Sequence, residues 1–315
     1  MPPTFDSLPL LSEGLSDMIE PQELAIVAGA SVEFEVLRQG FNQGFADYRY
    51  NMRMGAAGMD AYLRRNAIAL EDCAVLVAEN QGQRQSVGAA LLAVRNDEGW
   101  CGGLSVAPPY RGQGWGRRLM EKINCRAVEL GVRRILLEVL DSNESAVSLY
   151  RQLDFKIWRE LLVWERDPGQ GSLPLPNEQL EETDPGLILK EFYRWHDLPL
   201  SWQRRVSSLL KYVDQYACIG LTIPAKDGRA VAYVLAAQPQ PGQPVTRLRI
   251  LDIAAHPEAD PLCSAHPLLQ ALQLRYDNAK LTLMYEPTDS RLNPVFSALG
   301  FCIIDRHLEL KLDLL

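Results

Sequence analysis

The feature that most constrains the fold is a strand, a glycine-rich turn and a helix that follow one another over residues 103–119. An apolar run with strand character ends at Val106, and a helical pattern begins near Trp115. Between them, glycine stands at every second position of 112–116. The first N–H groups of such a helix lack helical partners, so several of them point at one place. The segment therefore predicts an anion site inside an α/β domain.

Charge and local geometry support the same prediction. A helix N-terminus carries roughly half a positive charge, and glycine lets the backbone approach a phosphate without an intervening Cβ. Arg111, Arg117 and Arg118 add formal charge. The turn lacks the Lys-Ser/Thr pair of a P-loop and the third glycine of a dinucleotide fingerprint. Glycines alone would also suit a tight strand-to-helix connection without a ligand.

Periodicity along the first half predicts an α/β domain with a mixed sheet. The expected order is two helices, three strands, then helix, strand, helix and strand, at residues 31–42, 56–66, 74–78, 86–94, 100–106, 115–130, 134–140, 145–153 and 156–164.

A composition break at 167–186, rich in proline, glycine and acidic residues, predicts a linker. The 315 residues suit two domains, which we place at 1–166 and 187–315. The second half repeats the order of the first, and Leu153-Asp154-Phe155 corresponds to Leu299-Gly300-Phe301. Two packed copies of one domain are therefore expected.

Composition excludes several classes of function. A net charge of −8 argues against a nucleic-acid binder, and the chain has no long apolar stretch or signal-peptide pattern. A cytoplasmic protein without a membrane segment is expected. The six cysteines are far apart and show no metal-ligand spacing, which predicts reduced core residues and no metal. The oligomeric state is not readable.

The pattern Arg-x-x-Gly-x-Gly, directly after Val106-Ala107-Pro108, resembles the pyrophosphate loop of the GNAT acetyltransferase superfamily. The downstream segment LLEVLDSNESAVSLYRQLDF, residues 136–155, is similar to the second motif of that family. The resemblance covers residues 74–164 well. It implies two GNAT-like domains, each with a mixed, mostly antiparallel sheet flanked by helices. The family usually has glycine before the residue that corresponds to Phe155, whereas this chain has Asp154. This is a turn position, which aspartate tolerates.

The resemblance also implies acetyl-CoA as the acyl donor. The strand before the loop would offer backbone groups of Leu104, Ser105 and Val106 to the pantetheine arm. The remaining contacts that it implies come from the loop and from two residues further on, namely Arg111, Gly112, Gln113, Gly114, Trp115, Gly116, Arg117, Asn143 and Tyr150.

Acetylation of an amine needs a base, a group that stabilises the oxyanion and an acid for the departing sulfur. Glu138 is the candidate base, because a carboxylate in an apolar strand should have a raised pKa. Its spacing to Asn143 and Tyr150 is similar to that in the ribosomal-protein alanine acetyltransferases, where this glutamate is assigned as base. A solvent-facing Glu138, or one paired with Arg133 or Arg134, is the alternative.

Tyr150 is the candidate acid, and a packed aromatic is the alternative for it. A backbone N–H near Val106 is expected to stabilise the oxyanion. Asp47, Asp72 and Glu98 remain substitute bases.

The acceptor is expected to be an amine, either a small molecule or a peptide. The segment 43–50 should line its pocket, with Phe45, Asp47 and Tyr48 as contacts, although an ordinary packed loop has the same composition.

In the second copy the anion loop and both proton-transfer groups are replaced, because Asp260, Cys263, Ala265, Met284 and Phe296 stand where Arg111, Gly114, Gly116, Glu138 and Tyr150 stand in the first. A degenerate second domain is expected, which could close the acceptor cleft. A non-catalytic acyl-CoA-binding module, and transfer to a hydroxyl or of a longer acyl group, stay open as alternatives.

Overall fold

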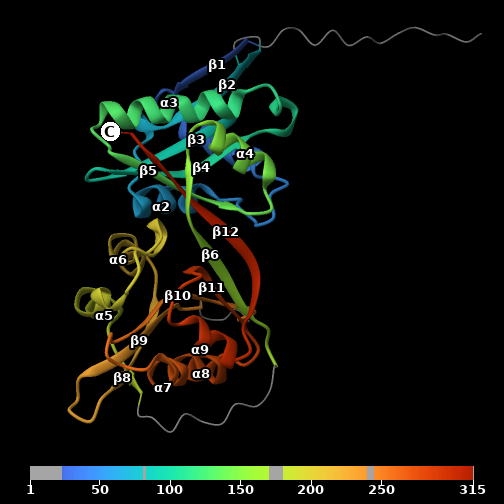
Figure 1. The fold of residues 1–315 in the computed structure, drawn as a ribbon. Coiled ribbons are helices and arrows are strands. Elements are labelled where there is room, and N and C mark those ends of the chain that lie inside the picture. Colours follow the sequence, from blue (N-terminus) through green and yellow to red (C-terminus); the bar gives the residue numbers. More distant parts are fainter. Residues whose placement is uncertain (1–22, 81–82, 170–179, 240–244, 315) are drawn as a thin grey trace, which may run out of the picture.

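The computed structural model describes residues 23–80, 83–169, 180–239 and 245–314. Its strands form a single sheet in the order β1-β2-β3-β4-β5-β12-β6-β11-β10-β9-β8-β7. Figure 1 shows the two halves of the chain at opposite ends of an elongated molecule, joined by the long strands β6 and β12.

The elements of the first half agree closely with the expected pattern. They are β1 (Glu23–Ala28), α1 (Phe34–Gly44), α2 (Ala56–Asn66), β2 (Ala74–Asn80), β3 (Gln83–Arg95), β4 (Glu98–Val106), α3 (Trp115–Glu129), β5 (Arg134–Leu140), α4 (Glu144–Gln152) and β6 (Lys156–Arg166).

The second half has the same order of strands. Its elements are β7 (Glu181–Glu182), α5 (Pro185–Phe192), α6 (Val206–Gln215), β8 (Cys218–Pro224), β9 (Ala230–Ala237), β10 (Arg247–Ala255), α7 (Pro261–Ser264), α8 (His266–Arg275), β11 (Lys280–Pro287), α9 (Asn293–Ala298) and β12 (Cys302–Asp313).

The sixth strand of each half pairs with the fifth strand of the other. β12 lies antiparallel to β5, and β6 lies antiparallel to β11, while β6 and β12 also pair with each other. The last strand of each half thus pairs with the fifth strand of the other half, so the strand pairing crosses the expected boundaries at 166 and 187. The local pattern of a strand does not predict this, because a strand can add to any sheet edge that offers unpaired backbone groups.

The expected linker at 167–186 also needs a correction at its end. Residues 170–179 lie outside the described residues. Beyond them, β7 pairs with β8, and Asp184 caps α5 by accepting a hydrogen bond from the backbone N–H of Leu187 at 2.7 Å. These last residues thus belong to the second half, because they complete its edge strand and its first helix.

The repeated tripeptides Leu153-Asp154-Phe155 and Leu299-Gly300-Phe301 occupy equivalent turns. Asp154 and Gly300 both adopt left-handed backbone conformations, with φ of 64° and 77°. The backbone N–H of Phe155 reaches the carbonyl of Tyr150, and that of Phe301 reaches the carbonyl of Phe296, at 3.1 and 3.0 Å. The repeat is therefore a structural one, and aspartate is accommodated at the departure from the family pattern.

The parallel strands β4 and β5 separate along their length. They pair only over the first three residues of each strand, from Glu98↔Arg134 to Trp100↔Leu136. The other side of β4 stays paired with β3 as far as Val106. Beyond Trp100, the edge of β4 that faces β5 therefore has backbone groups without strand partners, directly before the glycine-rich turn.

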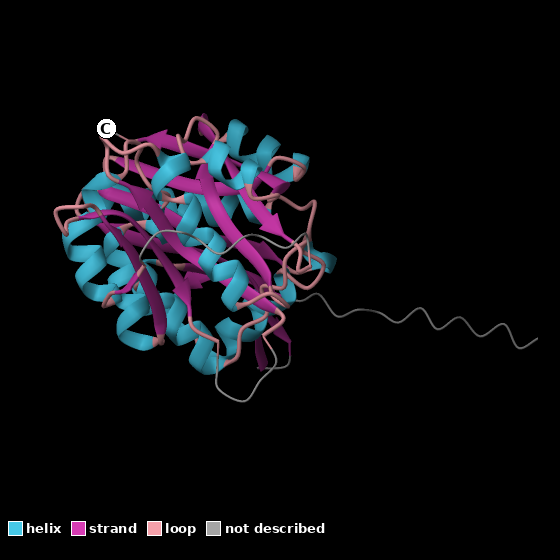
Figure 2. Cartoon of the chain, turned by 90° about the horizontal axis from the view of Figure 1, so that it is seen from below, coloured by secondary structure: helices cyan, strands magenta, loops and turns pink. Residues whose placement is uncertain are grey.

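Each face of the first half's sheet has its own core. Side chains of α3 and α4 pack on one face with Leu137 and Val139 of β5. On the other face α1 and α2 pack with Leu136, Trp100 and Trp202. Figure 2 shows helices on both faces of the strands.

Trp202 belongs to the second half but is fully buried against the first. Its ring stacks on Trp100 with centroids 5.9 Å apart, and its Nε1 donates to the carbonyl of Asn66 at 3.0 Å. Arg205 forms an ion pair with Glu98 at 2.6 Å. The face of the first half that carries α1 and α2 is thus covered in part by the second half.

Candidate active site

The glycine-rich loop has the conformation of an anion-binding turn. Gly112 and Gly114 have φ of 73° and 81°, which a residue with a Cβ adopts only with strain. Gly114 is the N-cap of α3, a helix of 15 residues. Residues 111–114 are exposed, so the first N–H groups of α3 face solvent and could hold a pyrophosphate.

The side chain of Arg111 turns back onto the protein. Its guanidinium makes two hydrogen bonds to the carboxylate of Asp47, at 2.7 and 2.8 Å, and further bonds to the carbonyls of Gly44 and Val106. These bonds lower the pKa of Asp47 to about 2. Arg111 therefore ties the loop to the segment after α1, and the backbone provides the anion site more directly than this side chain does.

The edge of β4 supplies the other expected backbone contacts. The N–H of Ala107 points to β3, where it donates to the carbonyl of Val87 at 2.7 Å. Since N–H groups alternate in direction along a strand, those of Val106 and Leu104 face the gap toward β5. A donor at Val106 is available there for an oxyanion.

Two predicted cofactor contacts come from the far side of this gap. Asn143 caps α4, and its side-chain oxygen accepts bonds from the backbone N–H of Ala146 at 3.3 Å and from the hydroxyl of Ser145 at 3.0 Å, which leaves its amide nitrogen for a ligand. Tyr150 is 7% exposed and packs against Phe155, with ring centroids 5.8 Å apart. Burial raises the pKa of Tyr150 well above its usual value, so its hydroxyl stays protonated.

Glu138 lies on the opposite face of β5 from the core that contains Tyr150. Trp100 Nε1 donates to its Oε2 at 2.7 Å, whereas its Oε1 is buried without a hydrogen-bond partner. Burial raises the pKa of Glu138 to about 8, and the charge of Glu309 adds to the shift. β5 is an inner strand of the sheet, and Arg134 pairs with Glu98 rather than with Glu138.

The substitute bases are engaged elsewhere. Asp47 is held as a carboxylate by Arg111. Asp72 pairs with Arg126 at 2.8 Å, and Glu98 lies between two arginines of the interface between the halves. Glu138 has a raised pKa that suits a base near neutral pH.

The predicted acceptor segment starts a row of aromatic rings. Phe45 contacts Tyr48 with centroids 5.3 Å apart, and Tyr48 lies 6.4 Å from Tyr50. The ring of Tyr50 stacks on His307, which in turn meets Tyr285 edge-on. The row runs from the loop after α1 to strands β12 and β11 of the second half.

Asp305 of β12 holds this segment in place. Its Oδ2 accepts a bond from the hydroxyl of Tyr50 at 2.5 Å and pairs with Arg49 at 2.8 Å. Burial and this bond raise the pKa of Tyr50. The segment is therefore a packed wall between the halves, whose rings could still contact an acceptor.

Sequence reasoning missed the contribution of β12. Asp305, His307 and Glu309 alternate along the strand and so share one face. That alternation is visible in the sequence, but it would equally suit a strand in the second half's own sheet. Only the exchange of strands brings these side chains beside β5 and the acceptor segment.

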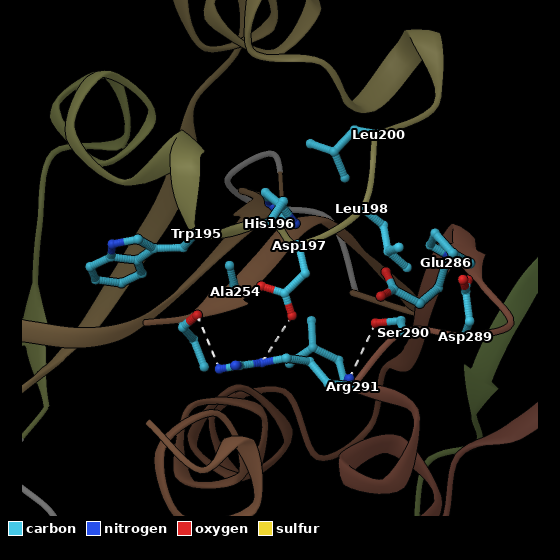
Figure 3. Close-up of a pocket in the computed structure, with 13 residues that line it drawn as sticks. Trp195, His196, Asp197, Leu198, Leu200, Ala254, Glu286, Asp289, Ser290 and Arg291 are labelled. Carbon is cyan, nitrogen blue, oxygen red and sulfur yellow. Dashed lines mark hydrogen bonds and ion pairs between the residues drawn. The ribbon is translucent and has the colours of Figure 1, made fainter. Parts of the chain in front are cut away.

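In the second half, Arg291 follows β11 and binds backbone carbonyls of the loop after β10, and it is one of the residues that line the pocket drawn in Figure 3. The guanidinium of Arg291 donates to the carbonyls of His256, Pro257 and Ala259 at 2.7, 2.7 and 2.9 Å. A cavity of about 110 Å³ remains, lined by Ala254 and Ala255 at the end of β10 among others.

A buried ion network fills the space beside this cavity. Arg204 binds the carboxylates of Asp252 and Glu286, and Asp252 also contacts His196 at 3.0 Å. The strand register agrees with the predicted loss of the base: Met284 lies four residues beyond the first β10–β11 pair at Lys280, as Glu138 does beyond Arg134.

Two further expectations were that the protein holds no metal and has no membrane segment. Within the described ranges, no group of three or more histidine, cysteine, aspartate or glutamate side chains is arranged to hold a metal ion. The helices of those same ranges include none that is long and apolar enough to cross a membrane.

Comparison with known proteins shows which family part of the chain resembles. Residues 42–155 match the model of the acetyltransferase (GNAT) family. The chain is 34% identical to the [Ribosomal protein bS18]-alanine N-acetyltransferase of Escherichia coli K12, over 25% of this chain and 60% of that protein. It is 39% identical to the thialysine N-epsilon-acetyltransferase of Sus scrofa, over 19% of this chain and 36% of that protein. It therefore spans 60% or less of the length of these relatives.

The fold of the whole chain also has solved counterparts. A tandem GNAT protein from the clavulanic acid biosynthesis pathway matches with a TM-score of 0.67 at 14% identity, over 93% of this chain and 99% of that one. A GCN5-related N-acetyltransferase from Sphaerobacter thermophilus matches with a TM-score of 0.64 at 15% identity, over 92% and 96%. These likenesses confirm the predicted fold of two GNAT-like units.

Proposed function

Since residues 42–155 match the model of the acetyltransferase (GNAT) family, we propose that this protein transfers the acetyl group of acetyl-CoA to a primary amine. The observation that carries the proposal is the gap between β4 and β5. It opens at the glycine-rich N-terminus of α3 and has Glu138, with a pKa of about 8, on one face. The relatives named above are N-acetyltransferases.

The residues around the gap fit the donor. Backbone N–H groups at the start of α3 would hold the pyrophosphate, and the free edge of β4 at Leu104 and Val106 would bind the pantetheine amides. Asn143 would contact the donor from the far side through its amide nitrogen. Acetyl-CoA supplies an acetyl group activated as a thioester.

Glu138 would take a proton from the acceptor ammonium. An alkyl amine with a pKa near 10.4 is almost fully protonated at pH 7, and a base whose pKa lies near the working pH removes its proton most effectively. The N–H of Val106 would donate to negative charge that develops on the carbonyl oxygen. The hydroxyl of Tyr150, kept protonated by burial, would donate to the sulfur as it leaves.

The test is release of free thiol from acetyl-CoA in the presence of a panel of primary amines, with the wild type and with Glu138→Gln. We expect turnover with at least one amine and a loss of roughly 10²-fold or more in the variant. Nucleotide binding in place of CoA would refute the proposal.

A second candidate is an acyl-CoA-binding module without turnover. It is favoured by one observation, namely that the second half keeps the fold although Arg291 binds the backbone carbonyls of its loop after β10. Tight acetyl-CoA binding with no thiol release for any amine would support this candidate over the enzyme.

A further inference from the structure

The carboxylate pair Glu138 and Glu309 joins the two halves of the chain. The two residues lie directly opposite each other on the antiparallel strands β5 and β12, so their side chains leave the sheet on the same face with Cβ atoms about 5 Å apart. Glu309 is completely buried. Two like charges at that separation inside a protein repel strongly.

Each carboxylate of this pair has one satisfied and one orphaned oxygen. Oε2 of Glu309 binds Nε of Arg159 at 2.5 Å, and Oε2 of Glu138 binds Trp100. Oε1 of each is buried without a hydrogen-bond partner. A buried acceptor without a donor is costly, and the cost falls when one of the two carboxylates carries a proton.

The charges around the pair decide where that proton resides. Burial raises the pKa of Glu309, and the charge of Glu98 adds to this shift, whereas the direct contact with Arg159 of β6 favours the ionised form of Glu309. Arg205 acts on both carboxylates more weakly. Three further titratable groups face Glu138 and are neutral at pH 7, because their ordinary pKa lies above 7 and burial raises it further, namely Tyr62 of α2, Cys101 of β4 and Tyr285 of β11.

We propose that Glu309, supplied by the second half, is a positioning residue that keeps a proton on Glu138 and so sets the pH above which the first half's site can accept a proton. The catalytic consequence rests on the proposed function, whereas the charge coupling does not. The second half then has a definite role, because its last strand shifts the protonation of the base in the first half.

The test compares full-length wild type with Glu309→Gln, which removes the charge but keeps an oxygen for Arg159. Two readouts are followed against pH: the acid limb of kcat/KM, and tryptophan fluorescence, since Trp100 binds the carboxylate of Glu138. Glu138→Gln identifies the fluorescence transition that belongs to Glu138, because it abolishes that transition.

We expect both midpoints to fall by roughly 1–2 pH units in Glu309→Gln. Glu309→Asp keeps the charge and should restore a midpoint near that of the wild type. The matched control is Glu160→Gln on β6, which lies opposite Leu308 and is half exposed. It removes an equal charge on the other face and should leave both midpoints unchanged.

Unchanged midpoints in a folded Glu309→Gln would overturn the inference, as would an equal shift in Glu160→Gln. A fluorescence shift without any turnover in the wild type would support the coupling and refute the proposed function. The two failures are thus distinguishable.

Discussion

Glu138 should lower the stability of the protein, and Glu138→Gln should raise it. The folded protein holds the pKa of Glu138 at about 8, above its ordinary value of 4.5. Unfolding therefore releases a proton at neutral pH, because the unfolded chain ionises this group and the folded chain does not. For an acid with a raised pKa, the stability is fully present below 4.5 and is lost as pH rises toward 8.

The magnitude follows from the size of the shift. Each pH unit between the two pKa values costs about 1.4 kcal/mol. At pH 7, 2.5 units above the ordinary pKa of 4.5, the penalty is about 3.5 kcal/mol, and above pH 8 it becomes constant. Glutamine does not titrate and keeps an oxygen for the N–H of Trp100, so Glu138→Gln should be free of this penalty.

The assay is urea unfolding of the wild type and Glu138→Gln at several pH values from 4.5 to 9. The stability advantage of the variant should be near zero at the acid end, grow with pH, and level off near pH 8, while acetyl transfer is lost. An advantage that does not change with pH would refute the reasoning, because it would mean that Glu138 titrates alike in both states. Glu160→Gln serves as the exposed control.

Three further predictions concern the rest of the site. Tyr150→Phe should lower kcat by roughly 10²–10⁴-fold with little change in acetyl-CoA affinity, and unchanged turnover would remove its role as the acid. Gly114→Ala should weaken acetyl-CoA binding in calorimetry. Gly131→Ala, which strains an equally left-handed glycine (φ 74°) at the far end of α3, should cost a similar ~1–2 kcal/mol of stability and leave binding intact; equal effects on binding would contradict the anion site. Asp47→Asn should leave the acid limb of the pH profile in place, because Arg111 keeps Asp47 ionised throughout that range; disappearance of the limb would make Asp47 the base.

Local chemistry made much of the first half predictable. The helix over 56–66 and the strand over 134–140 have the predicted bounds, because hydrophobic periodicity and turn residues mark their ends. The anion loop was predictable for the same reason: glycines with positive φ and a helix start are properties of a short segment.

Short or irregular elements were harder to predict from the sequence. The edge strands β1 and β7, strand β8 and the helices α5 to α7 had no counterpart in the sequence prediction. The two residues of β7 illustrate the cause, because they become a strand only by pairing with β8, and pairing partners are not encoded in a two-residue pattern.

The amino-acid sequence alone predicts a strand, a glycine-rich turn and a helix, with a carboxylate on the next strand whose pKa should be raised by burial. It does not predict that β12 completes the first half's sheet, that Glu309 faces Glu138, or that Arg111 binds Asp47, which the folded chain shows. The difference lies in how far apart in the sequence the interacting residues are. Helix and turn preferences are set within a few residues, whereas contacts between side chains some 170 positions apart depend on which sheet edge a strand joins.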